Sequence, residues 1–308
     1  MPNSSLIVSR LNKSFGNRHI IKDLSFEAHG GEIFGFLGPN GAGKTTTIKM
    51  VMGFLFPDSG DIYINGINTK KNYEAAMASI GGIVENPEMY KDLSGRTNLE
   101  MYARLHGTLD KKRIDELVNF VGMTARIHNK VKTYSLGMKQ RIGIAQALVH
   151  NPGVLILDEP TNGLDPAGIK ELRDILTYLA HEQGTAVIVS SHQLAEMALM
   201  CDRVGVIANG TLLSVDPIDA LLRKVTGESV VLVHTDGIRA KALLGELHAP
   251  RIRGADESTL RIVAEREEIP ALIRLLCDGG LSIYGVTEER ATLEDAYLTL
   301  TGGGGSIA

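Results

Sequence analysis

One stretch of eight residues constrains this chain more than any other part of it. Residues 38–45 read Gly-Pro-Asn-Gly-Ala-Gly-Lys-Thr and fit the pattern G-x-x-x-x-G-K-[ST] at every fixed position. The apolar run 33–37 before it is typical of a buried strand, and residues 44–54 are typical of a helix. A strand, a glycine-rich loop and a helix in this order predict a phosphate-binding loop within an α/β fold.

The loop also predicts how a nucleotide would be bound. Glycines let the backbone curl so that its N–H groups converge on phosphate oxygens at the positive end of the helix. Lys44 is expected to reach the β- and γ-phosphates, and Thr45 to bind Mg²⁺ through its hydroxyl. A plain glycine-rich turn is the alternative, but such a turn needs no Lys-Thr pair at this spacing. The expected nucleotide contacts are Gly38, Pro39, Asn40, Gly41, Ala42, Gly43, Lys44, Thr45 and Thr46.

Composition excludes several classes of protein. The chain has 308 residues, of which 44% are hydrophobic and 22% charged, as in an ordinary globular protein. A net charge of −4 gives no reason to expect nucleic acid as the main partner. No apolar run is long enough for a transmembrane helix and no signal peptide is recognisable, so we expect a cytoplasmic protein. Cys201 and Cys277 lie in no metal-binding pattern and are expected to be buried thiols.

The hydrophobic pattern divides the chain into three parts. Residues 1–220 are expected to form a nucleotide-binding domain, interrupted by a helical insertion over about 88–149. The pattern then restarts in the order β-α-β-α-β, which predicts a small α+β domain over 221–300. The glycine-rich residues 301–308 predict a flexible tail, either native or left by cloning. The small domain is expected to contain strands 230–233, 260–263 and 281–287 and helices 237–247 and 267–277.

A second candidate site, made of acidic residues, follows the apolar run 154–157. Such a run is typical of a central parallel strand buried on both faces, and it ends in Asp158, Glu159 and Pro160. A carboxylate at the end of this strand fits a second ligand to the Mg²⁺ of a nucleotide. Glu159 is then placed to accept a proton from an attacking water. An exposed acidic turn is the alternative interpretation.

Three further stretches, together with the loop and the acidic residues, make the chain resemble the ATP-binding subunit of an ABC transporter. Residues 134–141 resemble the signature loop, usually Leu-Ser-Gly-Gly-Gln; residues 163–165 resemble the D-loop; and residues 190–192 resemble the switch-histidine segment. The motifs run in family order from Phe15 to His192. The resemblance implies a P-loop NTPase fold of the ABC type, with a parallel-sheet core, an antiparallel β part and the helical insertion. It also implies ATP and Mg²⁺ as ligands, a homodimer, and separate membrane permease chains as partners.

The resemblance implies roles for individual residues. Ser135 and Gly137 would contact the ATP held by a second copy of the chain. His192 would donate a hydrogen bond to the γ-phosphate, Asp165 would lie at the dimer interface, and Phe15 would stack on adenine. Ser135 and Asp165 also fit simple helix N-caps, and Phe15 also fits an ordinary core side chain. These alternatives stay open at the level of sequence.

The chain departs from the family pattern in two places, the signature loop and the loop at Glu85. Leu136 and Met138 replace a Gly and a Gln of the signature, which narrows the backbone freedom of the loop. Glu85 stands where the family has a Gln that contacts Mg²⁺, so Glu85 is predicted as a catalytic and metal-binding residue. This change resembles the bacterial subgroup that exports lantibiotics and bacitracin-type peptides. An exposed loop acid is the alternative. The C-terminal domain resembles the accessory domain of that subgroup, including its ending at residues 292–298.

These observations predict an ATPase that powers export through separate permease chains. The expected cargo is an antimicrobial peptide or another hydrophobic compound, and the protein would lie on the inner face of the membrane. A soluble ABC-type ATPase of translation or DNA repair is the main alternative. Such proteins usually carry two cassettes or a long coiled coil, and neither is recognisable here. A non-catalytic regulatory module is disfavoured because Lys44, Asp158 and Glu159 are all present.

Overall fold

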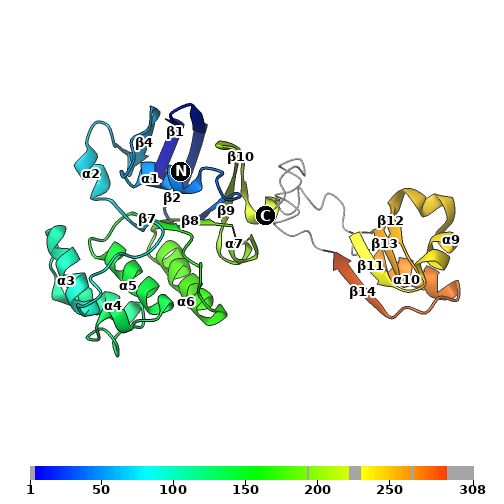
Figure 1. The fold of residues 1–308 in the computed structure, drawn as a ribbon. Coiled ribbons are helices and arrows are strands. Elements are labelled where there is room, and N and C mark those ends of the chain that lie inside the picture. Colours follow the sequence, from blue (N-terminus) through cyan, green and yellow to red (C-terminus); the bar gives the residue numbers. More distant parts are fainter. Residues whose placement is uncertain (1–3, 193, 222–229, 265–266, 290–308) are drawn as a thin grey trace. The chain divides into compact units, whose positions relative to one another are not determined.

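The computed structural model describes residues 4–192, 194–221, 230–264 and 267–289 (Figure 1). The chain divides into two compact units, the first ending at Ile218 and the second beginning at Asp219. None of the helices in these ranges combines the length and the apolar character needed to cross a bilayer. The expected ending at 292–298 and the tail at 301–308 lie outside the described residues.

A six-stranded sheet forms the centre of the first unit. Its strand order is β10-β9-β3-β8-β7-β6, and all neighbours are parallel except β9 and β10. Every residue of β3, β7 and β8 is buried, as expected for parallel strands covered on both faces. The strands are β3 (Ile33–Leu37), β6 (Ile80–Ile83), β7 (Val154–Asp158), β8 (Ala186–Ser191), β9 (Arg203–Ala208) and β10 (Thr211–Pro217).

A second, antiparallel sheet packs its apolar side chains into the same core. Its order is β2-β1-β4-β5. Phe26 of β2 stacks on Phe34 of β3, with ring centroids 5.3 Å apart, and so joins the two sheets. The two sheets and the helices together confirm the predicted α/β fold class. The strands are β1 (Ser4–Phe15), β2 (Arg18–His29), β4 (Ser59–Ile64) and β5 (Ile67–Asn68).

Helices connect the strands of the central sheet. Helix α1 begins at Lys44, in the last part of the glycine-rich loop. It ends at Val51, about one turn before the end of the predicted helix 44–54. Helix α6 continues into a π-helical turn at Tyr178–Glu182. These helices are α1 (Lys44–Val51), α2 (Tyr73–Met77), α6 (Pro166–Thr177) and α7 (Leu194–Met200).

Three helices between β6 and β7 pack on one another and gather at one end of the unit (Figure 1). They are α3 (Gly95–Leu105), α4 (Lys111–Phe120) and α5 (Leu136–Leu148). Two histidines mark the junction of this helical insertion with the sheet. The rings of His106 and His150 stack with centroids 4.2 Å apart, and Nε2 of His150 donates to the backbone oxygen of Ile80 in β6, at 2.9 Å.

The second unit contains one strand more than the sequence predicts. Its elements follow the order β-α-β-β-α-β, and the antiparallel sheet has the order β12-β13-β11-β14, which is a ferredoxin-like arrangement. The predicted order β-α-β-α-β is therefore wrong, because β12 was missed. The elements are β11 (Val230–His234), α9 (Gly237–His248), β12 (Ile252–Ala255), β13 (Thr259–Val263), α10 (Ile269–Asp278) and β14 (Gly285–Glu289).

Two local predictions in this unit are also wrong. The last strand begins at Gly285 and not at residue 281, because Leu281 packs into the core from a loop. Cys277 is exposed, whereas Cys201 is buried as expected. The reason is the helical period: Leu272 and Leu276 turn one face of α10 to the sheet, and Cys277 falls beside that face.

Candidate nucleotide-binding site

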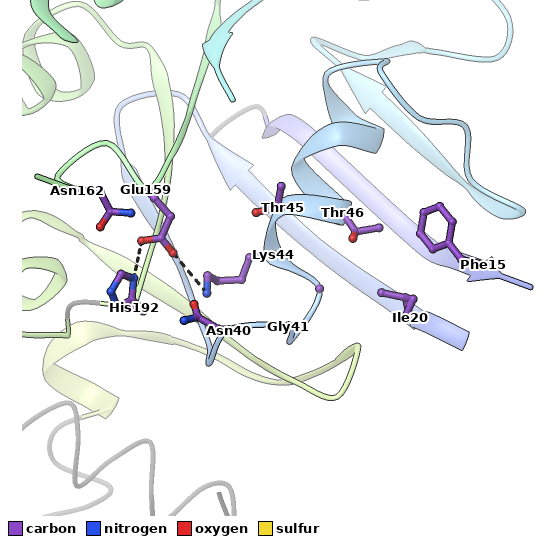
Figure 2. Close-up of a pocket in the computed structure, with 11 residues that line it drawn as sticks. Phe15, Ile20, Asn40, Gly41, Lys44, Thr45, Thr46, Glu159, Asn162 and His192 are labelled. Carbon is purple, nitrogen blue, oxygen red and sulfur yellow. Dashed lines mark hydrogen bonds and ion pairs between the residues drawn. The ribbon is translucent and has the colours of Figure 1, made fainter. Parts of the chain in front are cut away.

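A cavity of about 520 Å³ opens at the glycine-rich loop (Figure 2). Figure 2 shows Phe15 at one end of it, Glu159 and His192 at the other, and Lys44 and Thr45 between them. The cavity thus brings together residues from β1, the loop, α1 and the ends of β7 and β8. Its lining is Phe15, Ile20, Asn40, Gly41, Gly43, Lys44, Thr45, Thr46, Glu159, Asn162 and His192.

The loop conformation depends on glycine at defined positions. Gly43 caps α1 with φ of 110°, a backbone conformation that side-chain-bearing residues rarely adopt. A Cβ at Gly43 would also lie 2.5 Å from Cδ1 of Ile21. At Gly38 a Cβ would clash with the backbone oxygen of Ile207 in β9. The backbone of the loop can therefore approach β2 and β9 only because these positions lack side chains.

Lys44 is held inside the loop rather than extended into solvent. Its side chain is only 5% exposed, and its ammonium donates to the backbone oxygens of Gly38, at 2.7 Å, and Pro39, at 3.3 Å. The same ammonium lies 3.5 Å from Oε1 of Glu159. Lys44 therefore links the loop to the acidic end of β7.

The acidic end of the site is ordered by β8. In the parallel register, Asp158 faces Ser190, whose buried hydroxyl donates to Oδ1 of Asp158 at 2.5 Å. The backbone N–H of Glu159 donates to the same hydroxyl at 3.0 Å. Nδ1 of His192 donates to Oε2 of Glu159 at 2.7 Å. Two strand ends thus fix both carboxylates and aim Glu159 into the cavity.

Phe15 lies at the open rim of the cavity. Its ring is 50% exposed, so it is not the ordinary core side chain that the sequence left open as an alternative. The ammonium of Lys13 lies 5.6 Å from the ring centroid, over its face. A flat aromatic face beside a cationic group can stack on a nucleotide base.

Three of the predicted site residues lie away from this cavity. Ser135 and Asp165 are helix N-caps: the Ser135 hydroxyl accepts from Met138 N at 3.3 Å, and the Asp165 carboxylate from Gly168 N at 3.0 Å. Ser135 lines a different cavity, of about 530 Å³. Gly137 has open space around it, because a Cβ there would meet only Leu164, at 3.7 Å.

Glu85 is also outside the cavity lining. Its backbone is left-handed, with φ of 65°, and its carboxylate forms an ion pair of 2.9 Å with Lys49 of α1. Gly38, Pro39 and Ala42 form the loop but do not line the cavity, and Asp158 lies beneath it, 2% exposed.

Sequence reasoning missed Ser190, Asn162 and Ile20. Ser190 carried a signal, since it is the first residue of the switch-histidine segment and lies next to the last residue of the buried strand β8. Asn162 follows Glu159 by three residues and its backbone N–H donates to the Glu159 carbonyl at 3.2 Å. Ile20 gives no chemical signal, because it contributes only apolar surface.

The donor set suits Mg²⁺. The described residues contain no cluster of three or more His, Cys, Asp or Glu that could hold a metal by itself. The site instead offers the Thr45 hydroxyl and the buried Asp158 carboxylate. Mg²⁺ prefers such hard oxygens and completes its shell with waters and phosphate oxygens, so these residues fit the metal of a Mg-nucleotide.

Comparisons with known proteins agree with this geometry. The model of the ABC transporter family matches residues 21–162. The chain is 48% identical to the uncharacterized ABC transporter ATP-binding protein YhcH of Bacillus subtilis and 39% identical to the bacitracin transport ATP-binding protein BcrA of Bacillus licheniformis, in both cases over 96% of each chain. A solved ATP-binding subunit of an ABC transporter is 29% identical, with a TM-score of 0.65, over 72% of this chain and 93% of that one.

These relatives are transport proteins, which favours transport over the alternative in translation or DNA repair. The described glycine-rich loop, the paired carboxylates and the histidine beside them have the arrangement of a nucleotide-hydrolysing site. The chain belongs to the ABC transporter family of ATP-binding proteins and is an ATPase of that family.

Proposed function

We propose that this cavity binds Mg-ATP and that hydrolysis there drives export through separate permease chains. The observation that carries the proposal is the contact of Glu159 with both Lys44 and His192 at the inner end of the cavity. Phe15 stacks on adenine at the rim, and the loop N–H groups and Lys44 bind the phosphates. Thr45 and Asp158 would hold Mg²⁺, with Glu85 as a further ligand, and the ion would neutralise charge on the β- and γ-phosphates.

Glu159 acts as the general base in this proposal. Its carboxylate accepts a proton from the water that attacks the γ-phosphate, while Ser190 holds its backbone in place. In the structure, the Nδ1–H of His192 donates to Glu159. When ATP is bound, this histidine instead donates to the γ-phosphate. Catalysis of this kind is mainly positioning and charge stabilisation.

The active unit is a homodimer. Ser135 lines a separate cavity, and Gly137 beside it presents an open backbone at the start of α5. The N-terminus of a helix attracts phosphate, so these residues suit the ATP of a second copy. Asp165 is exposed and directly follows Leu164, whose side chain lies 3.7 Å from the Cβ position of Gly137, so Asp165 lies at the same interface.

The proposed dimer predicts that a charged side chain at position 137 prevents dimerisation. A Cβ at Gly137 would meet only Leu164, at 3.7 Å, so the free chain should accept Gly137→Glu, whereas the new carboxylate should meet the phosphates of the partner's ATP. In a Glu159→Gln background with ATP, light scattering should detect a dimer, and the added Gly137→Glu should leave a monomer with an unchanged Tm. Gly137→Ala is the matched control and should keep the dimer. A dimer in all three chains would contradict the proposed role of this surface.

The permease docks in a groove of about 300 Å³ between the helical insertion and the sheet. Its lining includes Phe54, Pro87 and Tyr102, and Phe54 is 69% exposed. Exposed aromatic side chains in a groove favour docking of another protein. The protein would thus be held at the inner face of the membrane by its permease.

The cargo is an antimicrobial peptide of the bacitracin or lantibiotic type. The similarity to a bacitracin transport protein over 96% of both chains supports this cargo. Cells that express this chain with its permease should become severalfold more resistant to such a peptide, as measured by the inhibitory concentration. The Glu159→Gln chain should give no resistance. Equal sensitivity of cells with the native and variant chains would exclude the tested peptide as the cargo.

A further inference from the structure

Lys49 and Glu85 form an ion pair one helical turn along α1 from Thr45, which is proposed to hold the metal. Lys49 follows Thr45 by four residues in α1, so both side chains lie on the same face of the helix, one turn apart. The ammonium of Lys49 lies 2.9 Å from Oε1 of Glu85, and the two side chains are 40% and 64% exposed. Four residues of helix, a rise of about 6 Å, thus separate the Lys49 position from the Thr45 position along α1.

The backbone of Glu85 is also unusual. Its φ of 65° is left-handed although the residue is not glycine. Non-glycine residues in this conformation are strained and gather at functional and switching sites. Glu159, which lies at the end of the neighbouring parallel strand, shares this feature with φ of 51°. The segment around Glu85 is therefore held in a conformation that the sequence itself does not favour.

Glu85 lies between the nucleotide cavity and the groove. On one side its carboxylate contacts α1, which carries Lys44 and Thr45. On the other side its sequence neighbours line the groove, namely Val84, Asn86, Pro87 and Glu88. A change in the position of Glu85 therefore involves the wall of the groove as well as the metal site.

We propose that Lys49 is a positioning residue. It holds the Glu85 carboxylate in an ion pair before the metal binds and competes for that carboxylate with the metal bound at Thr45. This inference rests on the proposed role of Glu85 as a metal ligand. Glu85 has two positions: paired with Lys49, or moved toward Thr45 and bound to the metal. This competition requires a glutamate at position 85, because the neutral amide of glutamine has no net charge for Lys49 to attract. An exposed ion pair is weak, so the metal can displace it.

Metal binding tests this competition directly. Mn²⁺ is titrated into the Glu159→Gln chain with saturating ATP and followed by electron paramagnetic resonance. Lys49→Met should tighten Mn²⁺ binding about two- to fivefold, since the competing exposed pair is lost. Lys49→Arg keeps the charge and should restore the native affinity. Lys70→Met removes a comparable exposed ion pair, with Asp61 at 3.4 Å, and should change nothing.

A second measurement uses fluorescence to detect a change in the groove. The chain contains no tryptophan, so Phe54→Trp places a single fluorescent reporter in the groove lining. With ATP present, added Mg²⁺ should change its emission, and Lys49→Met should shift the midpoint to a lower Mg²⁺ concentration. Lys70→Met should leave the midpoint in place.

The controls separate this inference from the proposed function on which it rests. If Glu85→Ala leaves Mn²⁺ affinity unchanged, Glu85 is not a metal ligand, and both the competition and the proposed metal-binding role of Glu85 fail. If Glu85→Ala weakens Mn²⁺ binding but Lys49→Met behaves like Lys70→Met, only the competition is overturned. If the effect of Lys49→Met persists in the Glu85→Ala chain, Lys49 acts on the metal without Glu85, which also overturns the competition.

Discussion

Glu159→Gln should slow ATP hydrolysis by about 10²- to 10⁴-fold, the usual effect of removing a general base. Glutamine keeps the size and the carbonyl-type oxygen of the side chain, so it can still accept the hydrogen bond from His192. It cannot take the proton of the attacking water. ATP binding, measured with a fluorescent analogue, should persist while phosphate release nearly stops.

The same variant removes the negative charge that lies 3.5 Å from Lys44, so ATP should bind at least as tightly as before. Glu116→Gln, a change of the same chemistry at an exposed position of α4, should leave kcat unchanged. Normal turnover in Glu159→Gln would assign the base to another group.

Gly43→Ala should lower ATP affinity by about 5- to 150-fold, which corresponds to backbone strain of 1–3 kcal/mol. Two independent effects act at this position. The φ of 110° is unfavourable for alanine, and the added Cβ would lie 2.5 Å from Cδ1 of Ile21. The loop must shift, and its N–H groups then no longer converge on the phosphates. Isothermal titration with ATP and Mg²⁺ measures the loss.

Gly184→Ala is the control for the cost of a positive φ alone. Gly184 has φ of 74° with no atom within 4 Å of an added Cβ, and it lies outside the nucleotide cavity. We expect a small loss of Tm and no change in ATP affinity. If both variants keep native affinity, the conformation at Gly43 is not needed for phosphate binding.

The sequence was sufficient to predict the loop and the acids beside it. Residues 38–45 form a local pattern whose glycines and Lys-Thr pair have one chemical explanation, and the apolar run before Asp158 identifies a buried parallel strand. Parallel strands bring their carboxyl ends to one edge, and Glu159 and His192 meet at that edge in the structure. These predictions rely on signals within a few residues.

Other features depend on contacts between distant segments. The pairing of Lys49 with Glu85 joins a helix and a loop 36 residues apart, and nothing in either segment specifies the partner. The strand Ile252–Ala255 is short and contains Gly254, so its pattern is too weak to recognise. It forms because the edge of β13 offers unpaired backbone groups.

The stacked histidines between the helical insertion and the sheet give this ATPase a dependence on acidity. Loss of solvent lowers the pKa of both His106 and His150 from the ordinary value of 6.5. As the pH falls below 6.5, the unfolded chain takes up protons that the packed rings do not. The contribution of these histidines to the free energy of unfolding is therefore fully present above pH 6.5 and declines below it. The junction between the helical insertion and the sheet would therefore lose stability as the pH falls below 6.5, and thermal unfolding followed across this pH range measures the loss.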